Sequence, residues 1–138
     1  MAKRRRGARS AGARPRPSRH RPFESLVDVA LAAIPEPFAG ALNEVAIVID
    51  DEPSADQRRE NEIAPDESLY GLYEGVPRTE WGADWAAIPN RITLFRLPLE
   101  EDFADPDDLA DEVWITVVHE LAHHLGIDDD RLHELGVD

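Results

Sequence analysis

The sequence contains no cysteine, a single methionine and few aromatic residues, which make up 7% of its 138 residues. Without cysteine, disulfide bonds, zinc–thiolate sites and thiol nucleophiles are all excluded. No apolar run approaches the roughly 18 residues of a membrane-spanning helix, and the basic N-terminus is not followed by the apolar segment of a signal peptide. We therefore expect a cytoplasmic protein that has no membrane partner.

Acidic residues are missing from the first 22 positions, and basic residues are scarce in the rest of the chain. Nine of the fifteen Lys and Arg residues lie in residues 1–22, and the other six are set against all 29 Asp and Glu residues. Residues 1–22 also lack large aliphatic and aromatic side chains after Met1. We therefore predict a disordered basic tail over residues 1–22, followed by one folded domain over residues 23–138.

The charge of each part limits its partners. A body with a balance of −23 after residue 22 repels nucleic acid. Binding of nucleic acid is therefore unlikely except weakly, through the tail. The alternatives are that the tail only keeps the protein in solution, or that it folds back on the acidic body.

Hydrophobic spacing in the body predicts short strands and helices. An apolar stripe after Phe23 predicts a helix that ends at Pro35, followed by a short helical piece over residues 36–42. Three short strands are predicted at residues 45–49, 69–75 and 91–96. Two loops are predicted at residues 51–67 and 97–105.

A long helix is predicted from Pro106 to Leu125. Asp105 is a good N-cap, and proline suits the first helical position. Gly126 follows the last apolar residue of the stripe and is expected to end the helix in the left-handed conformation. A last helical turn is expected at residues 131–135.

Near the end of this helix, two histidines lie four residues apart in the motif His119-Glu120-Leu121-Ala122-His123. Residues at this spacing share one helix face, so both imidazoles can bind one metal ion. Glu120 points about 100° round the helix from His119, where its carboxylate can accept a proton from a water on the metal. The motif predicts a hydrolytic zinc site in which Glu120 is the catalytic residue.

A catalytic zinc ion needs a third protein ligand and one open position for water. Because Gly126 turns the chain back, an acidic residue shortly after it can face the histidines. Asp129 is the predicted third ligand, because a carboxylate is a normal zinc ligand. Three acidic residues remain as alternatives, because spacing does not define the conformation of a loop: Asp128, Asp130 and Glu134. The other histidines of this region are predicted to lie on the surface or to support the ligands: His124 and His133.

The run from Val118 to Asp130, with Leu132 and residues 134–136, resembles the small bacterial family of minimal zincin metallopeptidases. The segment from Leu72 to Glu80 resembles a second hallmark of that family, and the similarity covers residues 23–136. The resemblance implies an α+β, minimal zincin-like fold. In that fold a small three- to four-stranded sheet packs on an active-site helix, with N-terminal helices beside it.

The same resemblance implies a zinc metallopeptidase that hydrolyses a peptide or protein substrate, with Glu120 as the base. It implies one zinc ion held by a triad of the Asp-zincin kind, formed by His119, His123 and Asp129. Met1 is the only methionine, so the methionine turn of metzincins is absent. The alternative is a zincin-like scaffold without catalysis, which binds a peptide or protein partner and has a vestigial or empty metal site.

A substrate is expected to add as a strand along a sheet edge, with Tyr73–Pro77 and Arg91–Phe95 as the candidate strands. The loop from Tyr73 to Glu80 is expected either to form a wall of the cleft or to pack on the helix. The oligomeric state is left open by the sequence.

Overall fold

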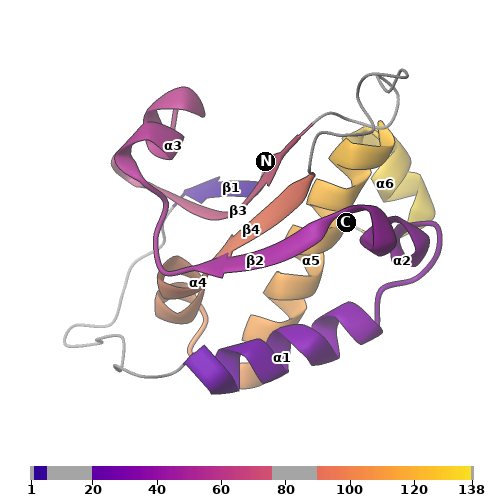
Figure 1. The fold of residues 1–138 in the computed structure, drawn as a ribbon, viewed down its shortest axis with the longest axis horizontal. Helices are drawn as coiled ribbons and strands as arrows, with labels where there is room; N and C mark the ends of the chain where they lie inside the picture. Colours follow the sequence, from indigo (N-terminus) through magenta and orange to yellow (C-terminus); the bar gives the residue numbers. More distant parts are fainter. Residues whose placement is uncertain (1, 6–19, 76–89, 138) are drawn as a thin grey trace.

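Four short strands form one mixed sheet in the order β1-β3-β4-β2 in the computed structural model, which describes residues 2–5, 20–75 and 90–137 (Figure 1). The strands are β1 (Ala2–Arg5), β2 (Ala46–Asp50), β3 (Glu67–Glu74) and β4 (Arg91–Phe95). β4 is antiparallel to β3 and parallel to β2, so it is an interior strand. The predicted α+β fold with a small three- to four-stranded sheet is confirmed.

The helices surround this sheet. They are α1 (His20–Ala32), α2 (Phe38–Ala41), the 3-10 helix η1 (Leu42–Glu44), α3 (Ala55–Glu60), α4 (Arg96–Asp102), α5 (Pro106–Leu125) and α6 (Asp129–Leu135). Two of them, α3 and α4, lie in segments for which the sequence predicted loops. The bounds of α5 agree with the prediction.

Polar side chains support both helices in different ways: a capping box satisfies the start of α3, whereas ion pairs hold the first residue of α4. At α3, the Ser54 hydroxyl accepts from the Gln57 amide at 3.0 Å, and the Gln57 side chain accepts from the Ser54 amide at 2.9 Å. At the start of α4, the buried guanidinium of Arg96 lies 2.9 Å from Asp51 and 2.6 Å from Glu100. The pair with Asp51 holds α4 against the end of β2, the pair with Glu100 lies within α4, and hydrophobic spacing alone does not reveal either pair.

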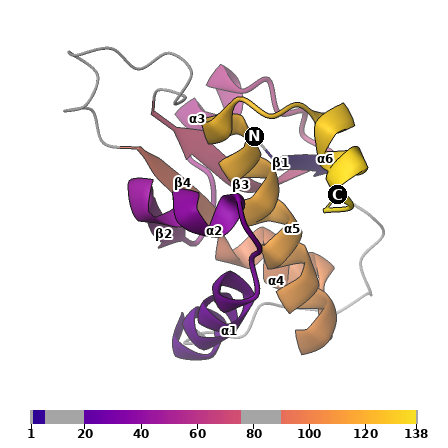
Figure 2. The same ribbon diagram turned by 90° about the vertical axis from the view of Figure 1, so that its right-hand side faces the viewer.

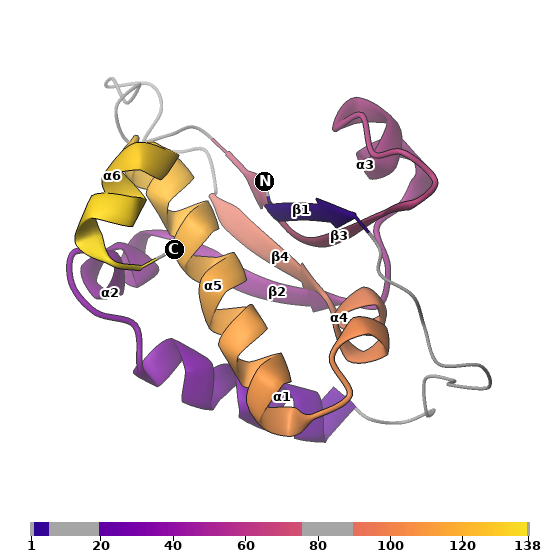
Figure 3. The same ribbon diagram turned by 180° about the vertical axis from the view of Figure 1, so that it is seen from behind.

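α5 is the longest helix and crosses one face of the sheet, as Figure 3 shows. The Asp105 carboxylate accepts from the Asp107 amide at 2.8 Å, and Pro106 occupies the first turn. At the other end, Gly126 has φ 74°, the left-handed conformation that favours glycine. Both predicted helix ends are therefore confirmed.

The main core lies between this face of the sheet and helices α1, α2 and α5. Its most deeply buried members include Phe23, Val27, Phe38, Ile92, Leu94, Leu121 and Leu132. A second cluster lies on the other face of the sheet, to which alternate strand side chains point. It contains Ile63, Leu69, Leu72 and Phe95. Ile92 through Phe95 of β4 are all buried because both faces of the sheet are covered.

β3 contains a register irregularity that decides which side chains face α5. Ala2 lies opposite Gly71 and Lys3 lies opposite Leu69, so Tyr70 is an extra residue on the β3 side. Because strand side chains alternate between faces, one extra residue reverses the alternation beyond it. As a result, Tyr70 and Tyr73 both belong to the main core, although they are three residues apart.

The structure differs from the predicted disordered tail over residues 1–22 in two places. Ala2–Arg5 form β1, which pairs antiparallel with β3, and α1 begins at His20 rather than near Phe23. Backbone pairing needs no large apolar side chains, and composition therefore could not indicate it. Residues 6–19 lie outside the described ranges. Within those ranges, no helix has both the length and the apolar character needed to cross a membrane.

Candidate metal centre

The last two turns of α5 present the two histidines of the predicted site. His119 is half-buried and His123 is exposed, whereas Glu120 between them has 0% of its surface exposed. This difference follows from the 100° that each residue turns about the helix axis. Burying a carboxylate is costly unless neighbouring groups compensate its charge. Buried ionisable groups of this kind are concentrated at functional sites.

A tight turn joins α5 to α6 directly after the histidines. The Ile127 amide donates to the Ala122 carbonyl at 2.8 Å, the bond that closes a left-handed glycine stop. Figure 2 shows α6 turning back from the end of α5. The turn therefore places the acidic run that follows Gly126 at the start of α6, directly after the histidine-bearing end of α5.

The four candidate third ligands differ in what they already contact. Asp128 caps α6 by accepting from the Arg131 amide at 2.9 Å, and Glu134 pairs with the Arg131 guanidinium at 2.9 Å. Asp129 and Asp130 are exposed in the first turn of α6, and neither carboxylate has a polar partner within the described residues. The described part of the chain contains no group of three His, Asp or Glu side chains placed to hold a metal ion. The structure thus brings the histidine pair together but does not bring Asp129 into one group with it.

His124, the next residue after the exposed histidine, is completely buried. Its Nε2 atom lies 2.9 Å from the carboxylate of Glu44 in η1, and its Nδ1 atom lies 2.8 Å from the hydroxyl of Tyr73 in β3. Since a carboxylate only accepts, Nε2 is the donor to Glu44. His124 therefore ties the end of α5 to both η1 and the sheet.

Tyr73 connects this buried histidine with the exposed one. Its ring lies against the His123 ring, with centroids 5.1 Å apart and planes inclined by 56°. Its hydroxyl lies against the His124 ring on one side and 3.1 Å from the side-chain oxygen of Asn90 on the other. Tyr73 thus holds one side of the His123 imidazole, while His124 and Asn90 hold the hydroxyl group of Tyr73 in place.

The spacing of apolar residues in the sequence indicates the burial of His124, although His124 lies beside the histidine motif. Val117, Leu121 and His124 follow the four- and three-residue spacing of one helix face, and the first two are core residues. That spacing predicts a buried His124. The partners Glu44 and Tyr73 come from distant segments, and no local pattern indicates them.

A close approach of α5 to β3 makes the Tyr73–His123 contact possible. A Cβ atom on Gly71 would lie 2.5 Å from the Cγ2 atom of Thr116, so any other residue would push the helix away. Thr116 is buried between two buried glutamates, Glu112 and Glu120, one turn away on either side. The hydrophobic spacing of the sequence did not indicate this polar stripe, which continues along the helix to the predicted catalytic residue.

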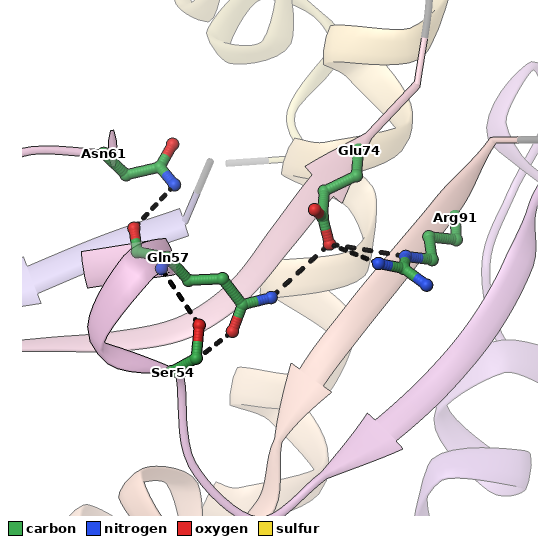
Figure 4. Close-up of polar contacts among 5 residues, drawn as sticks. All are labelled: Ser54, Gln57, Asn61, Glu74 and Arg91. Carbon is green, nitrogen blue, oxygen red and sulfur yellow. Dashed lines mark hydrogen bonds and ion pairs between the residues drawn. The ribbon is translucent and has the colours of Figure 1, made fainter. Parts of the chain in front are cut away.

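The end of β3 beside the site carries a charged contact on its other face. The Glu74 carboxylate accepts from Arg91 at 3.2 Å and from the Gln57 amide group at 3.5 Å, as Figure 4 shows. Glu74 thus joins β3, β4 and the cap of α3. The rest of the predicted wall, residues 76–80, lies outside the described ranges.

The donor set fits a zinc ion in its chemistry. Imidazole nitrogen and carboxylate oxygen are ordinary zinc ligands, and His119 and His123 lie one turn apart with the exposed Asp129 just past the connecting turn. The Tyr73 ring lies against the His123 ring, and contacts around a metal ligand help to orient it.

Comparison with known proteins identifies the family. A family model described as zincin-like metallopeptidase matches residues 42–137, which include β2 to α6. A solved structure of a conserved hypothetical protein from Thermo thermophilus is 25% identical, with a TM-score of 0.52. The match covers 86% of this chain and 99% of that one. No protein with a curated description matches. The chain therefore belongs to the zincin-like metallopeptidase family.

Proposed function

We propose that this protein is a zinc-dependent peptide-bond hydrolase in which Glu120 is the catalytic residue and His119, His123 and Asp129 hold the metal. The observation that carries the proposal is the end of α5, where two histidines one turn apart flank a buried glutamate. The family match supports the same proposal, because it includes this helix.

Zinc, when bound, would act as a Lewis acid toward water and the substrate carbonyl. The Glu120 carboxylate accepts a proton from the attacking water and later passes it to the leaving amine. Tyr73 keeps the His123 ring in one orientation, and the buried Glu44–His124 pair keeps Tyr73 in place. Asp129 is the third ligand that the sequence spacing favours. The contacts of Asp128 and Glu134 with Arg131 leave both Asp129 and Asp130 as candidates.

The alternative is a scaffold that binds a peptide or protein partner without catalysis. The observation that favours it is that no three metal-binding side chains are grouped within the described residues. In that case, binding of the partner would continue after removal of metal by a chelator.

The test is zinc content and affinity of the purified protein, compared with Asp129→Ala and with the matched control Asp130→Ala. The proposal expects one zinc per chain and a loss of affinity confined to Asp129→Ala, of at least about the 10–100-fold typical of supporting residues. Equal affinities in both variants would reject Asp129 as a ligand. No zinc binding at micromolar concentrations would reject the hydrolase and leave the scaffold.

A further inference from the structure

The sheet has one edge close to the histidines, and the topology decides which strand forms it. β4 is paired on both sides, so the predicted substrate strand Arg91–Phe95 has no free edge. α5 packs against β1, β3 and β4, and Tyr73 of β3 touches His123. The outer side of β3 is therefore the edge that runs past the site.

This edge already carries a strand from the same chain. Ala2–Arg5 pair antiparallel with Glu67–Gly71, and Figure 1 shows the N-terminus against β3. Ala2 is opposite Gly71, only two residues before Tyr73, so β1 points its N-terminal end toward the histidines. The register of β1 with β3 ends at Gly71, before Leu72 to Glu74.

Charge explains why this segment suits the edge. β1 belongs to a segment with nine basic and no acidic residues, whereas the rest of the chain has a balance of −23. Glu67 stands at the start of β3, and Arg5 lies opposite it in the register. A basic strand is thus attracted to this edge, and the ladder requires only backbone groups.

We propose that Ala2–Arg5 are an internal competitor on the outer edge of β3, where they occupy the place that an extended basic peptide would take as an added strand. A peptide that reaches along β3 toward Tyr73 must displace β1. The tethered segment has an effective concentration of the order of millimolar, which weakens competing peptides. Its role in restraining catalysis rests on the proposed hydrolase function, but strand exchange itself does not.

The test uses the full chain without metal. Arg4→Pro with Arg5→Pro removes at least one β3-facing amide, because successive residues alternate in direction along a strand. Arg4→Ala with Arg5→Ala is the matched control, since it removes the same charges and keeps both amides. The probe is a fluorescent peptide of residues 1–10, and the measurements are its anisotropy and amide hydrogen exchange in β3.

We expect the proline variant to bind the probe at least about tenfold more tightly than the wild type. Residues 67–71 should lose protection in that variant and regain it with the probe, while β2 and β4 stay protected. The alanine variant should lie between the two, and a probe with N-methylated backbone amides should not bind.

Two results would overturn the proposal: equal probe affinity in wild type and proline variant, or equal binding of the N-methylated probe. Failure of the hydrolase is distinguishable from these results. Strand exchange without zinc-dependent cleavage in any variant would leave the edge site in place and reject only the catalytic function.

Discussion

The two sides of the last turn of α5 carry adjacent histidines with opposite surroundings. His124 is completely buried, with Glu44 and Tyr73 on its two ring nitrogens, whereas His123 is exposed and lies against the Tyr73 ring. One residue along a helix is a rotation of about 100°. The comparison shows how a helix separates a group that builds the fold from a group on the surface, to which we assign metal binding by proposal.

The largest expected effect concerns Glu120, which is buried like His124 but belongs to the proposed chemistry. Glu120→Gln should lower kcat by about 10²–10⁴-fold, because the amide cannot accept the proton. Zinc affinity, measured by competition with a chromophoric chelator, should be nearly unchanged. A parallel loss of zinc would show that Glu120 acts through the metal site instead.

The two histidines themselves provide the sharpest test of the comparison. His123→Ala should lower zinc affinity by more than the roughly 10–100-fold typical of supporting groups, with little change in the free energy of unfolding. His124→Ala should lower the free energy of unfolding in urea by about 1–3 kcal/mol, because Glu44 and Tyr73 lose their buried partner. If both variants lose zinc affinity and stability to the same extent, the proposed separation of roles between His123 and His124 is wrong.

The close approach of α5 to β3 is expected to affect the stability of the helix end that carries both His123 and His124. Gly71→Ala should destabilise the protein by about 1–3 kcal/mol, because its Cβ atom meets the Thr116 methyl group. Thr116→Ser removes that methyl group, so the double variant should recover most of the loss in a thermal or urea unfolding experiment. An unaltered stability in Gly71→Ala would show that the helix moves away at little cost.

The smallest effect is expected for the hydroxyl group of Tyr73, the residue that contacts both His123 and His124. Tyr73→Phe keeps the ring on His123 but removes the hydroxyl, at a cost of about 1 kcal/mol in unfolding free energy. Zinc affinity should fall by about tenfold, the lower end for groups that orient a ligand. The absorption spectrum of the Co²⁺-substituted protein should shift as well. A loss of stability with unchanged spectrum and affinity would restrict Tyr73 to the fold.

Local chemistry was sufficient to predict several features of this protein. The cap at Asp105, Pro106 and Gly126 defined α5 to the residue, because helix ends are satisfied by neighbours in the chain. The pairing of His119 with His123 follows from helix geometry in the same way. β-branched and alternating segments indicated three strands of the sheet, with bounds displaced by one or two residues.

Tertiary contacts decided the rest. The extra residue at Tyr70 sets which side of β3 faces the helix, and Glu44 and Tyr73 meet His124 from positions 80 and 51 residues away. The pairing of Ala2–Arg5 with β3 depends on backbone groups that every sequence possesses. The amino-acid sequence by itself therefore determined which groups α5 carries. Only the folded chain decided which of them are buried, what holds them, and which strand lies at the edge beside them.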